Sequence, residues 1–320
     1  MSNRPPTVDG EQQWPSDLTA MDFARLFGTT LDALPEVCLE VIRERDFRYR
    51  VLSGGERDEI FLDVFKALSR QLEVAGAHRI KAWEEGWSET LADFRNSNFD
   101  LSTLVPKFVR PDAVIRLDGN YIRTAAADFE TGFVTVLRRW LFDHWFKDAD
   151  HVYEFGCGTG HNLVELAQQF PDKHLHGLDW ATASQQIICE INNTHGFGIE
   201  CDQFDLMSPN SGYVLEPGSG VFTVGTLEQM GTNFGPFLEY VLKGRPNICV
   251  NVEVLSETLD QDNLFDYVAA RYIEKRGYLN GYLKQLRNLE SEGQIEILQV
   301  QRTFGSLFHN GYEFVVWRPL

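Results

Sequence analysis

A glycine-rich turn between two strand-like segments constrains the fold more than any other feature of this sequence. The first segment, VYEF at 152–155, is short and apolar, and the turn GCGTG at 156–160 follows it directly. HNLVELAQQF at 161–170 then spaces its apolar residues as a helix does, and HLHGLDW at 174–180 is a second strand that ends near Asp179. Strand, turn, helix and strand in this order predict a βαβ unit, whose two strands lie parallel in one sheet.

The same alternation continues toward the C-terminus. The sequence predicts a helix at 183–193, strands at 198–206 and 220–227, a helix at 234–244, a strand at 247–255, and a pair of antiparallel strands at 294–304 and 312–320 joined by GSLFHNG. This pattern predicts an α/β fold over residues 151–320, namely a doubly wound, mostly parallel sheet with a terminal antiparallel strand pair.

The residues before the glycine turn follow a different pattern. Residues 1–20 are polar and contain proline, which predicts a flexible tail. Residues 21–150 repeat apolar side chains three or four apart, which predicts a mostly helical region with one small hairpin at 113–123. Its last helix, at 129–146, leads straight into the first strand. We therefore expect residues 21–150 to form a helical cover and substrate lid over the sheet domain.

Composition excludes several classes of partner. The chain has 320 residues and a formal charge of −18, which works against binding to nucleic acids or anionic membranes. It has neither a long apolar run nor a leader pattern, so we expect a cytoplasmic protein. Its five cysteines are scattered without a C-x-x-C pair, which indicates neither a disulfide framework nor a zinc site. The expected partners are a small-molecule substrate and, in a homodimer, a second copy of the chain.

The spacing of the glycines and the acids around them indicate the ligand. Gly156, Gly158 and Gly160 form G-x-G-x-G, which differs from the G-x-G-x-x-G of dinucleotide sites. Glu154 places negative charge where a phosphate binder needs none, but it would stabilise an ammonium group. Asp179 can accept hydrogen bonds from both hydroxyls of a ribose. The predicted ligand has a ribose and a cation but no phosphate, and S-adenosylmethionine fits that description.

The segments EFGCGTG at 154–160 and GLDW at 177–180 together resemble the cofactor site of class I S-adenosylmethionine-dependent methyltransferases of the small-molecule type. The resemblance covers roughly residues 150–320, and the family's reversed last strand agrees with the predicted terminal pair. It implies that Glu154 orders the turn and reaches the methionine amine, and that Asp179 holds the ribose. S-adenosylhomocysteine would be the product.

The resemblance also implies the remaining cofactor contacts. Glycines of the turn would admit the cofactor, and Trp180 would border its adenine. Asp205 matches the position that meets the adenine amino group, and Leu206 lies beside it. The whole implied cofactor set is Glu154, Gly156, Gly158, Gly160, Asp179, Trp180, Asp205 and Leu206.

One departure from the family bears on the methyl acceptor. Many relatives carry Leu-Glu-His after the fourth strand, whereas this chain has Leu227, Glu228 and Gln229. Histidine is the commonest general base for an alcohol, and glutamine cannot replace it. An amine or a thioether needs only positioning and desolvation. We therefore expect N- or S-methylation of a small amino-acid-like zwitterion, with the thioether of methionine as one candidate.

The candidate acceptor residues come from elements that the cofactor leaves free. The catalytic candidates are Glu228, Gln229, Glu253 and His309, and the substrate-binding candidates are Arg271, Tyr272, Arg276 and Tyr278. One alternative is a sugar O-methyltransferase of a polysaccharide or natural-product pathway, with Glu228, Glu253 or His309 as base. A second is a non-catalytic binding protein with the same fold. Trp83 and Trp87, at helical spacing, are expected in a core or an interface.

Overall fold

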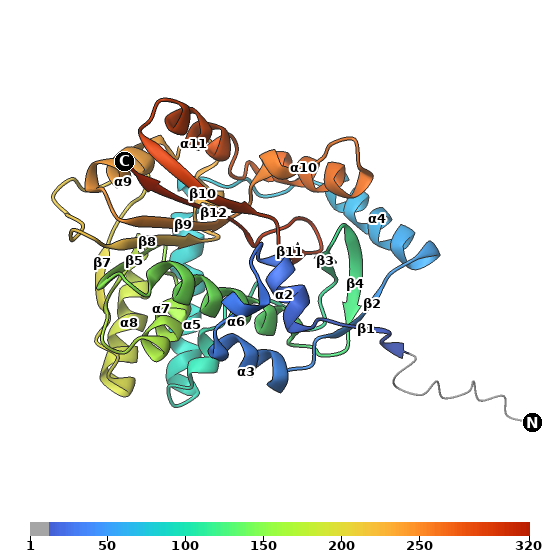
Figure 1. Cartoon of the computed structure of the whole chain (residues 1–320), viewed down its shortest axis with the longest axis horizontal. Helices are drawn as coiled ribbons and strands as arrows, with labels where there is room; N and C mark the ends of the chain where they lie inside the picture. Colours follow the sequence, from blue (N-terminus) through green and yellow to red (C-terminus); the bar gives the residue numbers. More distant parts are fainter. Residues whose placement is uncertain (1–12) are drawn as a thin grey trace, which may run out of the picture.

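The computed structural model describes residues 13–320, which form two β-sheets with helices packed around them (Figure 1). In chain order the elements are β1 (Ser16–Asp17), α2 (Ala20–Leu26), α3 (Glu36–Glu44), β2 (Arg48–Val51), α4 (Gly54–Ser69), α5 (Ile80–Asn96), β3 (Ile115–Leu117), β4 (Asn120–Thr124), α6 (Phe129–Leu141), β5 (His151–Phe155), α7 (His161–Gln169), β6 (His174–Asp179), α8 (Thr182–His195), β7 (Glu200–Gln203), β8 (Gly220–Val224), α9 (Gly235–Gly244), β9 (Ile248–Glu253), α10 (Leu264–Arg276), α11 (Tyr282–Ser291), β10 (Ile295–Gln301), β11 (Phe304–Ser306) and β12 (Glu313–Pro319). None of the described helices is long and apolar enough to cross a membrane.

The larger sheet has the predicted architecture. Its seven strands run in the order β10-β12-β9-β8-β5-β6-β7. The five strands from β9 to β7 pair in parallel, and β12 and β10 close the sheet in antiparallel pairing. The chain moves from β5 to β6 and β7 on one side and returns to β8 on the other. The carboxyl ends of β5 and β8 therefore flank the switch point, where open parallel sheets bind ligands.

Helices cover both faces of this sheet, which explains why its central strands β5, β8 and β9 are buried and mostly apolar. Val152 of β5 packs into the core that contains α6, α7 and α8. The next residue, Tyr153, points the opposite way and packs with α9 and α11. Because successive side chains of a strand alternate between its faces, a sheet buried on both sides needs apolar residues at every position.

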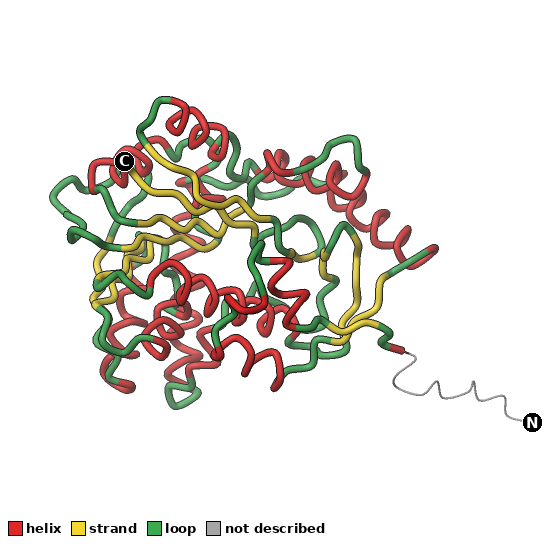
Figure 2. Tube along the Cα trace, viewed as in Figure 1, coloured by secondary structure: helices red, strands yellow, loops and turns green. Residues whose placement is uncertain are grey.

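The smaller sheet corrects the sequence interpretation in two places. Its order is β1-β2-β4-β3-β11, and its described pairings are antiparallel. The predicted hairpin is confirmed as β3 and β4, but the region expected to be mostly helical also contains β2, and β1 lies in the segment expected to be a flexible tail. The segment GSLFHNG is not a simple turn, because its first two residues belong to β11, which leaves the larger sheet and pairs with β3. Figure 2 shows the two sheets as separate yellow groups.

Part of the segment predicted as a flexible tail is ordered. Residues 1–12 lie outside the described part of the chain, but β1 and the start of α2 fall within 13–20. Thr19 and Asp22 form a reciprocal capping box that fixes the start of α2. The domain boundary near residue 150 stays a prediction.

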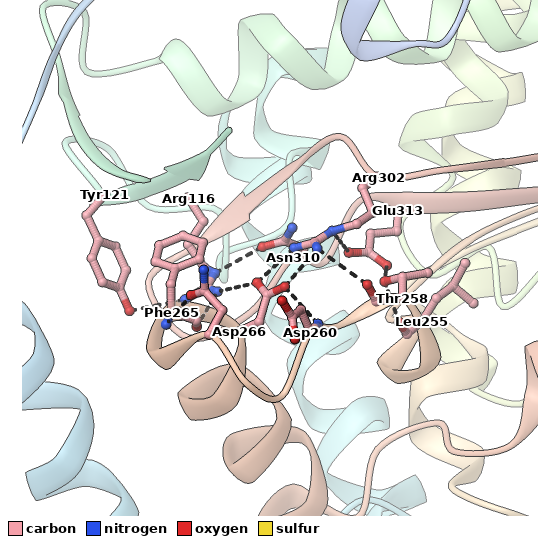
Figure 3. Close-up of polar contacts among 11 residues, drawn as sticks. Arg116, Tyr121, Leu255, Thr258, Asp260, Phe265, Asp266, Arg302, Asn310 and Glu313 are labelled. Atoms are coloured by element: carbon pink, nitrogen blue, oxygen red, sulfur yellow. Dashed lines mark hydrogen bonds and ion pairs between the residues drawn. The ribbon is translucent and has the colours of Figure 1, made fainter. Parts of the chain in front are cut away.

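A buried ionic network ties the smaller sheet to the C-terminal elements (Figure 3). Arg116 of β3 is fully buried and donates to the side-chain oxygen of Asn310 at 3.0 Å. It lies 3.7 Å from Asp266 of α10, which also accepts two hydrogen bonds from Arg302. Arg302 in turn lies 3.3 Å from Glu313 of β12. A buried guanidinium is tolerated only when its donors are satisfied, so this network fixes β3 against α10 and β12.

Candidate functional site

A cavity opens at the switch point of the larger sheet. It encloses about 1120 Å³, counting its open mouth. The glycine turn after β5, the ends of β6 and β8, and a 3-10 turn at Leu227–Met230 form one side. Helix α5 and the loop at 105–109 also line the cavity. Its position at the carboxyl ends of the strands is where open parallel sheets bind nucleotide-like ligands.

The first two glycines are required by the geometry of the turn. Gly156 has φ +74°, and a Cβ there would lie 2.2 Å from Thr226 Cγ2. Gly158 has φ +52°, and a Cβ there would lie 2.9 Å from the ring of Trp87. Both conformations and both close approaches favour glycine. These two residues line the cavity, so the backbone of the turn is open to a ligand.

Gly160 has a different role from the one expected. It also has a positive φ, +72°, but it begins α7, and a Cβ there would face Ile188 of α8. It is absent from the cavity wall. The structure therefore assigns Gly160 to the packing of α7 against α8.

Asp179 lies at the end of β6 and lines the cavity beside the turn. One carboxylate oxygen accepts the Gly158 amide at 2.9 Å, and the other accepts the Ala181 amide at 2.8 Å. Burial raises the pKa of this carboxyl to about 6. Each oxygen keeps a second lone pair for a ligand hydroxyl. Trp180, Asp205 and Leu206, the other predicted contacts on this side, line the same cavity.

A chain of polar side chains links Glu154 to Arg138. Glu154 Oε1 accepts a hydrogen bond of 2.6 Å from Asn162, whose own oxygen accepts one of 2.9 Å from Arg138. Asn162 and Arg138 line the cavity, and Glu154 lies behind them, 1% exposed. Glu154 Oε2 and Arg138 Nε have no partner among the described residues. Burial raises the pKa of Glu154 to about 8 and lowers that of Arg138.

The Glu154 carboxyl and the Arg138 guanidinium each have one polar atom that could bind a ligand. Buried charges are costly unless a partner satisfies them. A ligand with both an ammonium and a carboxylate could satisfy Glu154 and Arg138 together. Sequence reasoning missed Arg138, although a cation between Val134 and Leu141 on the apolar stripe of α6 was a signal.

Of the four predicted catalytic residues, one lines the cavity, and it lies in the 3-10 turn after β8. This residue is Gln229, and its Nε2 donates to Glu228 at 2.8 Å. Glu253, fully buried at the end of β9, instead accepts the amides of Thr226 and Glu228 at 3.0 and 3.1 Å and holds the turn in place. Burial, followed by the charge of Glu253, raises the pKa of Glu228 to about 8, and burial raises that of Glu253 to about 7.

The other predicted acceptor residues lie outside the cavity wall. Arg271 forms a surface ion pair with Glu274 at 2.8 Å. Arg276 lies 4.8 Å from the ring of Tyr278 and donates to the hydroxyl of Tyr272. His309 also packs against these two tyrosines, and burial lowers its pKa to about 3. Aromatic packing at the end of α10 thus holds this cluster, and none of the four substrate-binding candidates lines the cavity.

Two tryptophans expected in a core or an interface line the cavity instead. Trp83 and Trp87 of α5 are half-buried, with ring centroids 5.4 Å apart. Helix α5 is fixed over the site by Glu84, whose carboxylate accepts the amides of Thr182 and Ala183 at the start of α8. His161, also missed from the sequence, lines the cavity as a neutral ring, because burial lowers its pKa to about 2.

Comparisons with known proteins give only distant structural similarity. No protein-family profile and no curated protein matches this sequence. The structure is similar to PigF with SAH, at a TM-score of 0.44 and 13% identity, over 82% of this chain and 71% of that one. It is also similar to the O-methyltransferase NcsB1 from neocarzinostatin biosynthesis, solved in complex with S-adenosylmethionine and 2-hydroxy-5-methyl naphthoic acid. The TM-score is 0.42 and the sequence identity 12%, over 83% of this chain and 70% of that one. A third similar structure is N,N-8-amino-8-demethyl-D-riboflavin dimethyltransferase from Streptomyces davawensis, with a TM-score of 0.39 and 12% sequence identity over 60% of this chain and 57% of that one. Similarity at this level carries no conclusion about family or activity.

Proposed function

We propose that the protein is an S-adenosylmethionine-dependent methyltransferase that acts on a small-molecule acceptor. The observation that carries the proposal is that Arg138 and Asp179 line one cavity and that Asn162, in the same wall, links Arg138 to the buried Glu154. An ammonium on Glu154, a carboxylate on Arg138 and a ribose on Asp179 correspond to the polar parts of this cofactor. The unpartnered atoms Glu154 Oε2 and Arg138 Nε support the fit. Glu154 also opposes a pyrophosphate, which disfavours nicotinamide dinucleotides.

The residues around the cavity would bind and orient the two reactants. When bound, the cofactor would supply an electrophilic methyl group on its sulfonium, and transfer of this group to a lone pair of the acceptor would leave S-adenosylhomocysteine. Trp180, Asp205 and Leu206 would border the adenine. Trp87, packed on Gly158, would exclude water from the reacting centre. Gln229 would position the acceptor atom.

Gln229 also bears on which atom is methylated. Its Nε2 is held by Glu228, and its Oε1 is buried without a partner among the described residues. An amine or a hydroxyl can donate to this oxygen, whereas a thioether cannot. We therefore favour an amine or a hydroxyl acceptor over methionine sulfur. Methylation of an amino-acid-like amine and O-methylation of a sugar remain the two acceptor classes proposed from the sequence.

Calorimetric titration of the full chain tests the proposal. S-adenosylhomocysteine should bind with micromolar affinity, and NAD⁺ should not bind. Asp179→Ala should weaken S-adenosylhomocysteine binding by roughly 10- to 150-fold for each charge-assisted hydrogen bond lost. Asp202→Ala, at an exposed carboxylate on β7, is the matched control and should leave the affinity unchanged. Because Asp179 also holds two backbone amides, circular dichroism should confirm that the variant is folded. Comparable binding of NAD⁺, or unchanged affinity in a folded Asp179→Ala, would contradict the proposal.

A further inference from the structure

We infer that the methyl acceptor is a neutral aromatic ring compound with a hydroxyl or amino group, bound against Trp83 and Phe108 with its donor on Gln229. This inference rests on the proposed function and narrows its acceptor class. It comes from the cavity-lining residues of α5, the loop at 105–109 and Met230, which are outside the proposed set of cofactor contacts.

None of the described residues that line this part of the cavity is charged, and Arg79, 5.8 Å from the Trp83 ring, pairs with Glu73 at 3.1 Å. This part is formed by α5, the loop after it, and the end of the 3-10 turn. The residues that these elements contribute are Trp83, Trp87, Val105, Pro106, Phe108, Val109 and Met230. Lys107 lies within the same loop, but its ammonium pairs with Asp93 at 2.7 Å and Glu89 at 3.4 Å. A zwitterion or a phosphorylated acceptor would lose its hydration against this wall without gaining a partner.

Aromatic surface dominates this wall. Trp83 and Trp87 lie with their rings tilted by 32° to each other, and Phe108 is 63% exposed at the same cavity. Partly exposed aromatic side chains at a cavity bind a flat apolar partner favourably, because the rings can stack on it or contact it edge to face. A planar ring fits this surface.

Two unpartnered polar atoms define the acceptor's polar group. Gln229 Oε1 needs a donor, and Trp83 Nε1 needs an acceptor; both are buried without a partner among the described residues. A hydroxyl or an amino group can donate to Gln229 Oε1, and an oxygen of the acceptor can accept from Trp83 Nε1. A sugar would bring several further hydroxyls against Val105, Pro106 and Val109, whose side chains offer no hydrogen bond. The limited polarity of the wall therefore favours an aromatic compound over a sugar.

The test is calorimetric binding to the full chain saturated with S-adenosylhomocysteine, at pH 6.5. The probes are 7-hydroxycoumarin, 7-methoxycoumarin, methyl α-D-glucopyranoside and L-methionine. We expect 7-hydroxycoumarin to bind about tenfold more tightly than its methyl ether, because only the hydroxyl can donate to Gln229. The glucoside and L-methionine should bind more weakly than either coumarin.

Three variants separate the contacts. Gln229→Met should bring the two coumarins to equal affinity, whereas Phe108→Leu should weaken both and keep their ratio. Phe65→Leu, at an exposed aromatic residue of α4 outside the cavity wall, is the control and should change neither. Tighter binding of the glucoside or L-methionine than of 7-hydroxycoumarin would overturn the inference. So would a folded Gln229→Met that keeps the preference.

If Gln229→Met fails to fold, the wild-type protein is enough for the test. Equal affinity of the wild type for the two coumarins would contradict the role of Gln229. Failure of the wild-type chain to bind S-adenosylhomocysteine is a different result. It would overturn the proposed function, whereas normal binding of S-adenosylhomocysteine with the wrong acceptor preference would overturn only this inference.

Discussion

Several carboxyl groups at the site are buried deeply enough to titrate near neutral pH. Burial raises the pKa to about 8 for Glu154, about 7 for Glu253 and about 6 for Asp179. Each value lies above that of the unfolded chain, so the folded state binds more protons between about pH 4 and 8. These groups therefore favour folding most at low pH, and their contribution is lost as the pH rises through the folded pKa values.

Glu154 makes ligand binding depend on pH. At pH 7 its carboxyl is largely protonated in the free protein, and an ammonium beside it would stabilise the ionised form. We therefore expect S-adenosylhomocysteine binding at pH 7 to release a proton, and its affinity to rise between pH 6 and 8. Calorimetry in buffers of different ionisation enthalpy measures the proton directly. Glu154→Gln should remove the release, whereas Glu165→Gln, on the neighbouring helix α7, should keep it. Binding of the wild type without proton release would count against the ammonium contact.

At the scale of elements, the contact between α5 and α8 holds α5 beside the site. The residue before α8 is Ala181, whose side chain cannot cap a helix, and Glu84 of α5 supplies the missing acceptor for Thr182 and Ala183. An N-terminal cap with negative charge is worth about 1–2 kcal/mol. Glu84→Ala should lower the free energy of unfolding by that amount in urea denaturation. Glu85→Ala, which removes only a 3.7 Å surface pair with Lys81, should cost less than about 0.5 kcal/mol. Equal effects of the two substitutions would show that the cap adds nothing.

The elements also show what the sequence could and could not predict. Strands β5 and β6 and helix α7 were predictable because their apolar periods and the glycine turn are local signals. The three residues of β11 were not, because they pair with β3 nearly two hundred positions earlier and no local pattern records that pairing. The same limit applies to the site. Gly156 and Asp179 carry a recognisable spacing, whereas Trp83 reaches the cavity only through the docking of α5 on α8.

At the scale of the whole molecule, the cavity depends on both parts of the chain. One apolar core runs from Phe23 and Phe133 through Val152 to Phe314 without interruption. The network around Arg116 adds a second link between the smaller sheet and the C-terminal elements (Figure 3). Arg138 comes from α6 and Asp179 from β6, so the proposed cofactor site is complete only when residues on both sides of position 150 are folded together.

The central claim is that this cavity holds the amino-acid group of S-adenosylmethionine between Glu154 and Arg138. The most direct test compares, by calorimetry, S-adenosylhomocysteine with 5′-methylthioadenosine, which keeps the nucleoside but lacks that group. In the wild type, S-adenosylhomocysteine should bind more tightly by roughly 10- to 150-fold for each charged contact. Arg138→Met should reduce this difference by lowering only the affinity for S-adenosylhomocysteine. Equal affinity of the wild type for the two ligands, or an unchanged difference in Arg138→Met, would contradict the account.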